Sequence, residues 1–84
     1  MEISIKDQFV QDARARALAV LAYVAHKEGE KKNAEAFKES LNGIALNIEQ
    51  SGSRLETIVW GFWNVKSNEK FIEDFKETMM QLGI

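Results

Sequence analysis

The chain carries few side chains that could act as a nucleophile or a general base. It has one histidine, His26, and no cysteine, so thiol catalysis and thiolate metal sites are excluded. A serine or threonine nucleophile needs a base positioned beside it. His26 stands beside Lys27 and Glu28 near the expected end of a helix, where a histidine is usually a solvated surface residue. The residue types therefore predict a protein that is not an enzyme and that needs no cofactor.

Carboxylates are more numerous, but their spacing is more typical of a solvent-exposed helix face than of a metal site. Glu69, Glu73 and Glu77 recur every fourth residue, which places them in one row on a helix. Such a row is most simply a solvated helix face. His26 and Glu30 also have a ligand-like spacing, but the glycine between them is expected to end the helix. We expect no metal site.

Aromatic and basic residues leave a small-ligand site open as one alternative. A tryptophan or tyrosine could stack on the planar ring of a nucleotide at a subunit junction, while an arginine contacts its phosphate. A tryptophan on a helix, however, is much more often a packing residue. The candidate residues are Trp60, Trp63 and Tyr23 for stacking, with Arg14, Arg16 and Arg54 for the phosphate.

A DNA-binding regulator is a second alternative. Two helices joined by Ser51-Gly52-Ser53 have the outline of a helix-turn-helix. The second of these helices offers Arg54 against Glu56, whereas phosphate anchoring needs several basic side chains. The formal net charge of -2 gives no long-range attraction to a polyanion. Nucleic acid is therefore disfavoured as a partner.

The elements that carry these residues are all expected to be helical. The chain has no proline, and the glycines at 29, 52 and 83 fall where the apolar periodicity stops. The pattern predicts an all-α fold of one domain, residues 1–84: a compact bundle of four helices at about 5–28, 34–50, 54–65 and 68–82. We expect Asn33 to cap the second helix. A turn at Asn42-Gly43 is the alternative to a single helix over 34–50, but the apolar stripe stays in phase across that pair.

The first helix is rich in alanine and is expected to lie at the centre of the bundle. Nine consecutive apolar residues run from Ala17 to Ala25, and a helix that is apolar all round needs neighbours on several sides. We expect the polar side to hold Asp12, Arg16, Tyr23 and His26. A second apolar strip, on an adjoining side, consists of Ala15, Leu18, Ala22 and Ala25. The main inward stripe is predicted to be Phe9, Val10, Ala13, Ala17, Val20, Leu21 and Val24.

The sequence predicts a cytoplasmic protein that does not enter a membrane. The apolar run is far shorter than the roughly 20 residues that a spanning helix needs. Acidic residues at 2, 7 and 12 disfavour a cleaved signal peptide, whose leader is basic.

More apolar residues fall outside the inward stripes than one small core readily uses. One interpretation is an irregular bundle that covers them within the chain. The other is a contact surface, because tryptophans are frequent anchors of protein interfaces. The second interpretation predicts a homodimer or a protein partner, bound through Leu18, Ala22, Ala25, Leu46, Trp60, Trp63 and Met80.

The sequence therefore favours a non-enzymatic protein-interaction module, a small acidic helical regulator or inhibitor that forms a homodimer. Compact chains without a catalytic constellation are common among regulators encoded by phages and mobile elements, including those that act on host or defence proteins. The link to phages and mobile elements comes from this general class of proteins and from no particular residue of the chain. The small-ligand site and the DNA-binding regulator stay open as alternatives.

Overall fold

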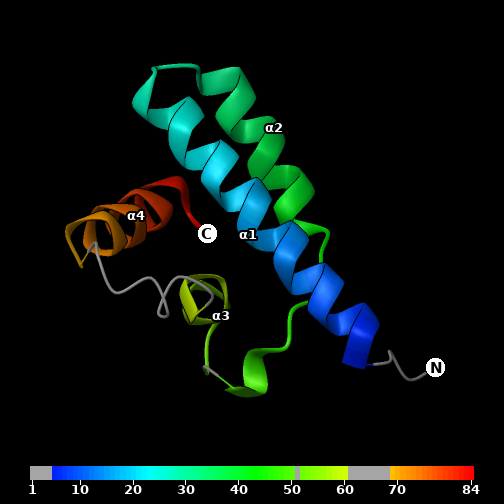
Figure 1. The fold of residues 1–84 in the computed structure, drawn as a ribbon. Coiled ribbons are helices and arrows are strands. Elements are labelled where there is room, and N and C mark those ends of the chain that lie inside the picture. Colours follow the sequence, from blue (N-terminus) through cyan, green and yellow to red (C-terminus); the bar gives the residue numbers. More distant parts are fainter. Residues whose placement is uncertain (1–4, 51, 61–68) are drawn as a thin grey trace.

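A computed structural model describes residues 5–50, 52–60 and 69–84 (Figure 1). Within these ranges the chain forms α-helices and one short 3-10 turn and no strand, which confirms the all-α prediction. In chain order the elements are α1 (Ile5–Lys27), α2 (Lys31–Asn42), η1 (Ile48–Gln50), α3 (Arg54–Trp60) and α4 (Glu69–Leu82).

Helix α1 is the central element, as predicted. It is 23 residues long and contacts each of the other three α-helices. Helix α2 turns back and lies along one side of α1, while α3 and α4 lie on another side (Figure 1). None of the described helices has the length and apolar character that a membrane crossing requires.

The turn between α1 and α2 is built around Gly29. Its φ of 77° lies in the left-handed region, which a residue with a side chain adopts only with strain. The Gly29 amide donates to the His26 carbonyl at 3.1 Å, and the Glu30 amide donates to the Ala25 carbonyl at 2.9 Å. These two bonds form a Schellman motif, which satisfies the last carbonyls of α1. The glycine therefore ends the first helix where the sequence predicted an end.

Both predicted ends of the second helix are wrong. Helix α2 begins at Lys31 with Glu30 at its N-cap and without a side-chain cap, because the compact turn at Gly29 leads directly into it. Asn33, the predicted cap, lies inside the helix. The helix ends at Asn42, with Gly43 as its C-cap, so the turn considered as the alternative is the one that forms. The apolar periodicity continues beyond it, but in this segment it does not indicate a helix.

Replacing each of these two glycines by alanine should give opposite results. Gly29→Ala should lower the free energy of unfolding by about 1 kcal/mol, because the alanine must adopt a positive φ. Gly43 has φ -77°, and a Cβ there would meet nothing nearer than the Ser40 carbonyl oxygen at 3.5 Å. Gly43→Ala should therefore stabilise the protein by about 0.5 kcal/mol. Urea unfolding of the two variants measures both changes, and a Gly43→Ala variant less stable than wild type would contradict this assignment.

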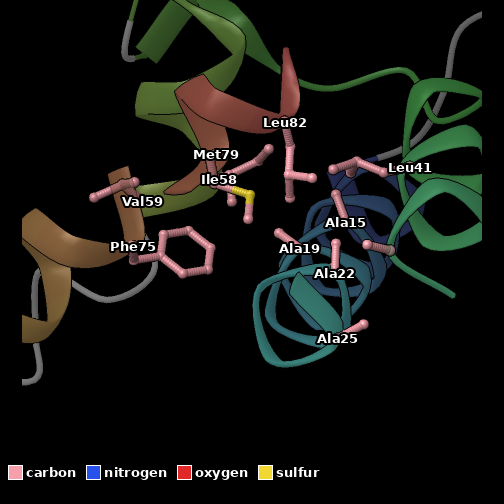
Figure 2. Close-up of a cluster of buried hydrophobic side chains, with 11 residues drawn as sticks. Ala15, Ala19, Ala22, Ala25, Leu41, Ile58, Val59, Phe75, Met79 and Leu82 are labelled. Atoms are coloured by element: carbon pink, nitrogen blue, oxygen red, sulfur yellow. The ribbon is translucent and has the colours of Figure 1, made fainter. Parts of the chain in front are cut away.

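The face that α1 turns toward the core is its alanine face. Ala15, Ala19, Ala22 and Ala25 are buried, and Figure 2 shows them on the side of α1 turned toward α2 and α4. The large side chains of the core come from the other helices instead, and small residues on one helix let large residues of its neighbours approach closely. These large buried residues are Leu41 of α2, Ile58 and Val59 of α3, and Phe75, Met79 and Leu82 of α4.

The predicted inward stripe of α1 is therefore wrong. Phe9, Val10, Leu21 and Val24 are exposed, and of the predicted stripe only Val20 packs partly against the core. In α3 and α4 the helical spacing of large apolar residues does coincide with the buried face, since Ile58 and Val59 of α3 and Phe75 of α4 are buried. The pattern failed at α1 because it ranked the faces by side-chain size, whereas the fold selects the face that allows close helix packing.

Candidate interaction surface

The most distinctive surface in the described part of the chain is an apolar stripe on α1, which we call the outer face. It consists of Phe9, Val10, Ala13, Ala17, Leu21 and Val24, all exposed. Its four larger side chains are between 46% and 67% exposed. At about 100° per residue the six positions fall within an arc of about 120°, over about four turns. The stripe is therefore continuous and lies opposite the alanine face.

The area of the outer face is large for a chain of this size. Four large and two small apolar side chains at these exposures present on the order of 400 Å² of apolar surface, within the range of the largest patches on monomeric proteins, which are often functional. Single exposed apolar residues are normal, and Ile48 and Met80 are such cases elsewhere in the chain. The outer face differs from them because its residues are contiguous on one helix.

Charged residues border the outer face. Arg14 and Arg16 lie on its two edges, while Lys6 lies near its first turn and Glu28 just beyond its last. Lys6 and Glu28 are both exposed. The ion pairs formed among the described residues involve other side chains, namely Lys27 with Asp74 and Lys76 with Glu56. A stripe with an apolar centre and a polar rim has the general anatomy of a protein interface.

The rotation of α1 about its own axis is fixed by a clasp to α4. The Tyr23 hydroxyl donates to Oδ2 of Asp74, and the Lys27 ammonium donates to Oδ1 at 2.9 Å. The Tyr23 ring packs against Phe71 and Phe75, with ring centroids 5.6 Å apart in each pair. Tyr23 was predicted to lie on the polar side of the first helix. That prediction is wrong for its ring, which packs in an aromatic cluster. The clasp keeps the outer face turned away from α4.

The same clasp shifts the ionisation of its three members. Hydrogen bonds from Tyr23 and then Lys27 hold the pKa of the Asp74 carboxyl below its ordinary value. The hydrogen bond to Asp74 raises the pKa of the Tyr23 hydroxyl and is also the largest cause of the raised pKa of Lys27. A carboxyl with a lowered pKa in the folded state stabilises the fold above its unfolded pKa, and this contribution is lost as the pH falls through the folded value.

Acidification should therefore reduce the difference between wild type and Asp74→Asn. At neutral pH the wild type should be the more stable of the two. The difference should shrink as the pH falls below about 4, the ordinary range of an aspartate, because protonation removes the same charge. Urea midpoints of both proteins across this range give the measurement, with Tyr23→Phe as a variant that removes one donor. A difference that stays constant with pH would show that the ionised carboxylate of Asp74 does not contribute to stability.

A second anchor holds the loop after α2. The Arg54 guanidinium, at the start of α3, donates to the carbonyls of Leu41 and Ile44, and burial lowers its pKa. Oδ1 of Asp12 accepts hydrogen bonds from the Gln8 side chain at 2.9 Å and from the Asn47 amide at 3.4 Å. Asp12, which was expected on the polar side of the first helix, therefore tethers this loop to α1. Arg54 was a candidate residue both for the small-ligand site and for DNA binding. In the structure its guanidinium instead binds backbone carbonyls.

The residues predicted to form an interface do not form one surface where the structure describes them. Ala22 and Ala25 are 0% and 3% exposed within a single chain, so they belong to the core between the helices. Leu18 and Leu46 are partly buried against that core. Met80 is exposed on α4. The Trp60 side chain and Trp63 lie outside the residues that the structure describes, so their predicted role stays a prediction.

The side chains first considered for chemistry remain dispersed. His26 is partly buried in the last turn of α1, and the acidic row of α4 is exposed as predicted. No group of three histidine, aspartate or glutamate side chains in the described ranges is placed to hold a metal ion. Compared with protein-family models, curated proteins and solved structures, the chain gives no match.

Proposed function

We propose that this protein is a non-enzymatic protein-interaction module, a small helical regulator or inhibitor that acts by binding another protein chain through the outer face of α1. The observation that supports this proposal is the exposure of Phe9, Val10, Leu21 and Val24 on a helix whose opposite face is buried. Burying such a stripe against a second apolar surface releases water from it, which favours association.

The spacing of the outer face suits a helical partner surface. Positions 10, 13, 17, 21 and 24 are separated by three, four, four and three residues, a spacing that keeps them on one side of a helix, as in helices that pack along their length against another helix or into an apolar groove. Phe9 and Leu21 are the largest side chains of the stripe, and we assign them the role of anchors. Ala13 and Ala17 between them allow the partner to approach closely.

A photo-crosslinking residue tests the proposal in the cells that produce the protein. Phe9 is replaced by a photoreactive phenylalanine analogue, with the same analogue at Ala36, an exposed residue of α2, as the matched control. We expect a discrete covalent protein adduct from position 9 that is absent from position 36 and is lost when Leu21→Glu is added. No adduct from position 9, or equal adducts from both positions, would overturn the proposal.

A further inference from the structure

Resting on that proposed function, we infer that the partner of the outer face is the outer face of a second copy. The two α1 helices run antiparallel and cross at Ala17. The exposure of the outer face does not by itself identify what binds it, but the order of residues along the stripe favours a second copy of the chain. Two properties of the stripe, the symmetric spacing of its residues about Ala17 and its opposite end charges, point to this arrangement.

Five of the six apolar residues of the outer face are spaced symmetrically about Ala17. Val10 and Val24 each stand seven residues from it, and Ala13 and Leu21 each stand four. In an antiparallel pair centred on Ala17, Val10 meets the partner's Val24, and the small Ala13 meets the larger Leu21 of the partner subunit. An alanine lies at the crossing point, where two helices approach most closely. These five positions are therefore complementary in shape to their own inverse, whereas Phe9 has no such counterpart, because the position inverse to it is the buried Ala25.

The charges at the two ends of the stripe are complementary only in this orientation. Lys6 stands eleven residues before Ala17 and Glu28 eleven residues after it. An antiparallel pair thus brings Lys6 beside the partner's Glu28 at both ends of the contact. A parallel pair would bring lysine to lysine and glutamate to glutamate, which disfavours it. Arg14 and Arg16 lie on the edges, where their long side chains reach solvent.

The size of the contact predicts a weak dimer. Each copy contributes on the order of 400 Å² of apolar surface, about half of the roughly 800 Å² per partner in a stable interface of standard size. We therefore expect the dimer to be reversible and to dissociate on dilution. Because the contact ends in two symmetric ion pairs, its affinity should fall as the salt concentration rises.

Single-cysteine variants test the register directly, since the chain has no cysteine of its own. Ala17→Cys should form a disulfide-linked dimer under mild oxidation with copper phenanthroline, because the two copies of this residue meet at the crossing point. Val24→Cys should not, because fourteen residues at 1.5 Å each separate the two copies by about 21 Å, beyond the reach of a disulfide. Ala36→Cys, on α2, is the matched control and should form no disulfide-linked dimer.

Charge variants test the orientation without a covalent bond. Lys6→Glu should weaken dimerisation at least about tenfold in sedimentation equilibrium, and Lys6→Glu combined with Glu28→Lys should restore it. Circular dichroism of each variant establishes that the monomer is folded. Failure of the double variant to restore the affinity would overturn the antiparallel pairing. Equal crosslinking of Ala17→Cys and Val24→Cys would overturn it as well.

The photo-crosslink at position 9 separates this inference from the proposed function. An adduct of twice the chain mass supports a second copy as the partner. An adduct of any other mass, with no disulfide dimer from Ala17→Cys, overturns the self-pairing and leaves the interaction module standing. No adduct of any kind overturns both.

Discussion

Phe75→Ala is expected to lower the free energy of unfolding by about 3–5 kcal/mol, while Phe9→Ala is expected to change it by less than about 0.5 kcal/mol. The two substitutions remove the same side chain from helices of the same protein. Phe75 is 0% exposed and packs against the Tyr23 ring, whereas Phe9 is 67% exposed on α1. The difference therefore comes from the cavity left in the core and from the lost burial.

Urea unfolding of both variants gives the comparison, at protein concentrations low enough to keep the chain monomeric. The predicted inward stripe of the first helix placed Phe9 in the core, and a core position there would give similar losses for both variants. A loss of several kcal/mol at Phe9→Ala would therefore contradict the orientation of α1 described above.

Ala22→Glu is expected to prevent stable folding or to cost at least about 3–5 kcal/mol. Ala22 is 0% exposed on the alanine face, so a glutamate there must bury an unpaired carboxylate and also force the packed helices apart. Ala36→Glu on α2 makes the same replacement at an exposed position and should cost less than about 0.5 kcal/mol. Thermal unfolding followed by circular dichroism measures both variants.

An Ala22→Glu protein as stable as Ala36→Glu would mean that the alanine face is open to solvent. That result would restore Leu18, Ala22 and Ala25 as part of the contact surface that the sequence predicts. It would also remove the basis for an outer face on the opposite side.

The helical fold class and the order of the helices could be predicted from the sequence. The helix ends that depend only on neighbouring residues could be predicted as well. Gly29 and Gly83 both have a positive φ and end their helices, because a C-terminal glycine turn needs only neighbouring residues. Ser53-Arg54-Leu55-Glu56 has the Ser-x-x-Glu pattern of a capping box, and the Ser53 hydroxyl oxygen accepts from the Glu56 amide at 3.1 Å at the start of α3. The Glu56 side chain, however, pairs with Lys76 of α4 at 3.0 Å.

The errors arose where contacts between distant residues decide the structure. Helix α2 was expected to continue to Gln50, but Arg54 donates hydrogen bonds to the carbonyls of Leu41, in the last turn of α2, and of Ile44, just after it. A side chain ten or more residues away in sequence has no signature in a local periodicity. The Tyr23 to Asp74 hydrogen bond spans 51 positions and is equally invisible to such a pattern.

The candidate surface could have been found only in part. The run from Ala17 to Ala25 showed that α1 has two apolar faces, and one of them had to remain free if the neighbours covered the other. Side-chain size pointed to Phe9, Leu21 and Val24 as core, because larger residues release more free energy on burial. At α1 the geometry of close helix packing overrides that preference. The alanine face is buried, and the more hydrophobic face remains exposed to solvent.

The central claim is that α1 presents its larger apolar side chains to solvent, and Leu21→Glu tests it most directly. Glutamate has nearly the helix propensity of leucine, so the substitution tests the environment of the side chain rather than the helix. The measurement is the free energy of unfolding of this variant in urea at monomeric concentration. A value within about 0.5 kcal/mol of wild type is the predicted result. A loss of several kcal/mol would place Leu21 in the core and contradict the orientation of α1.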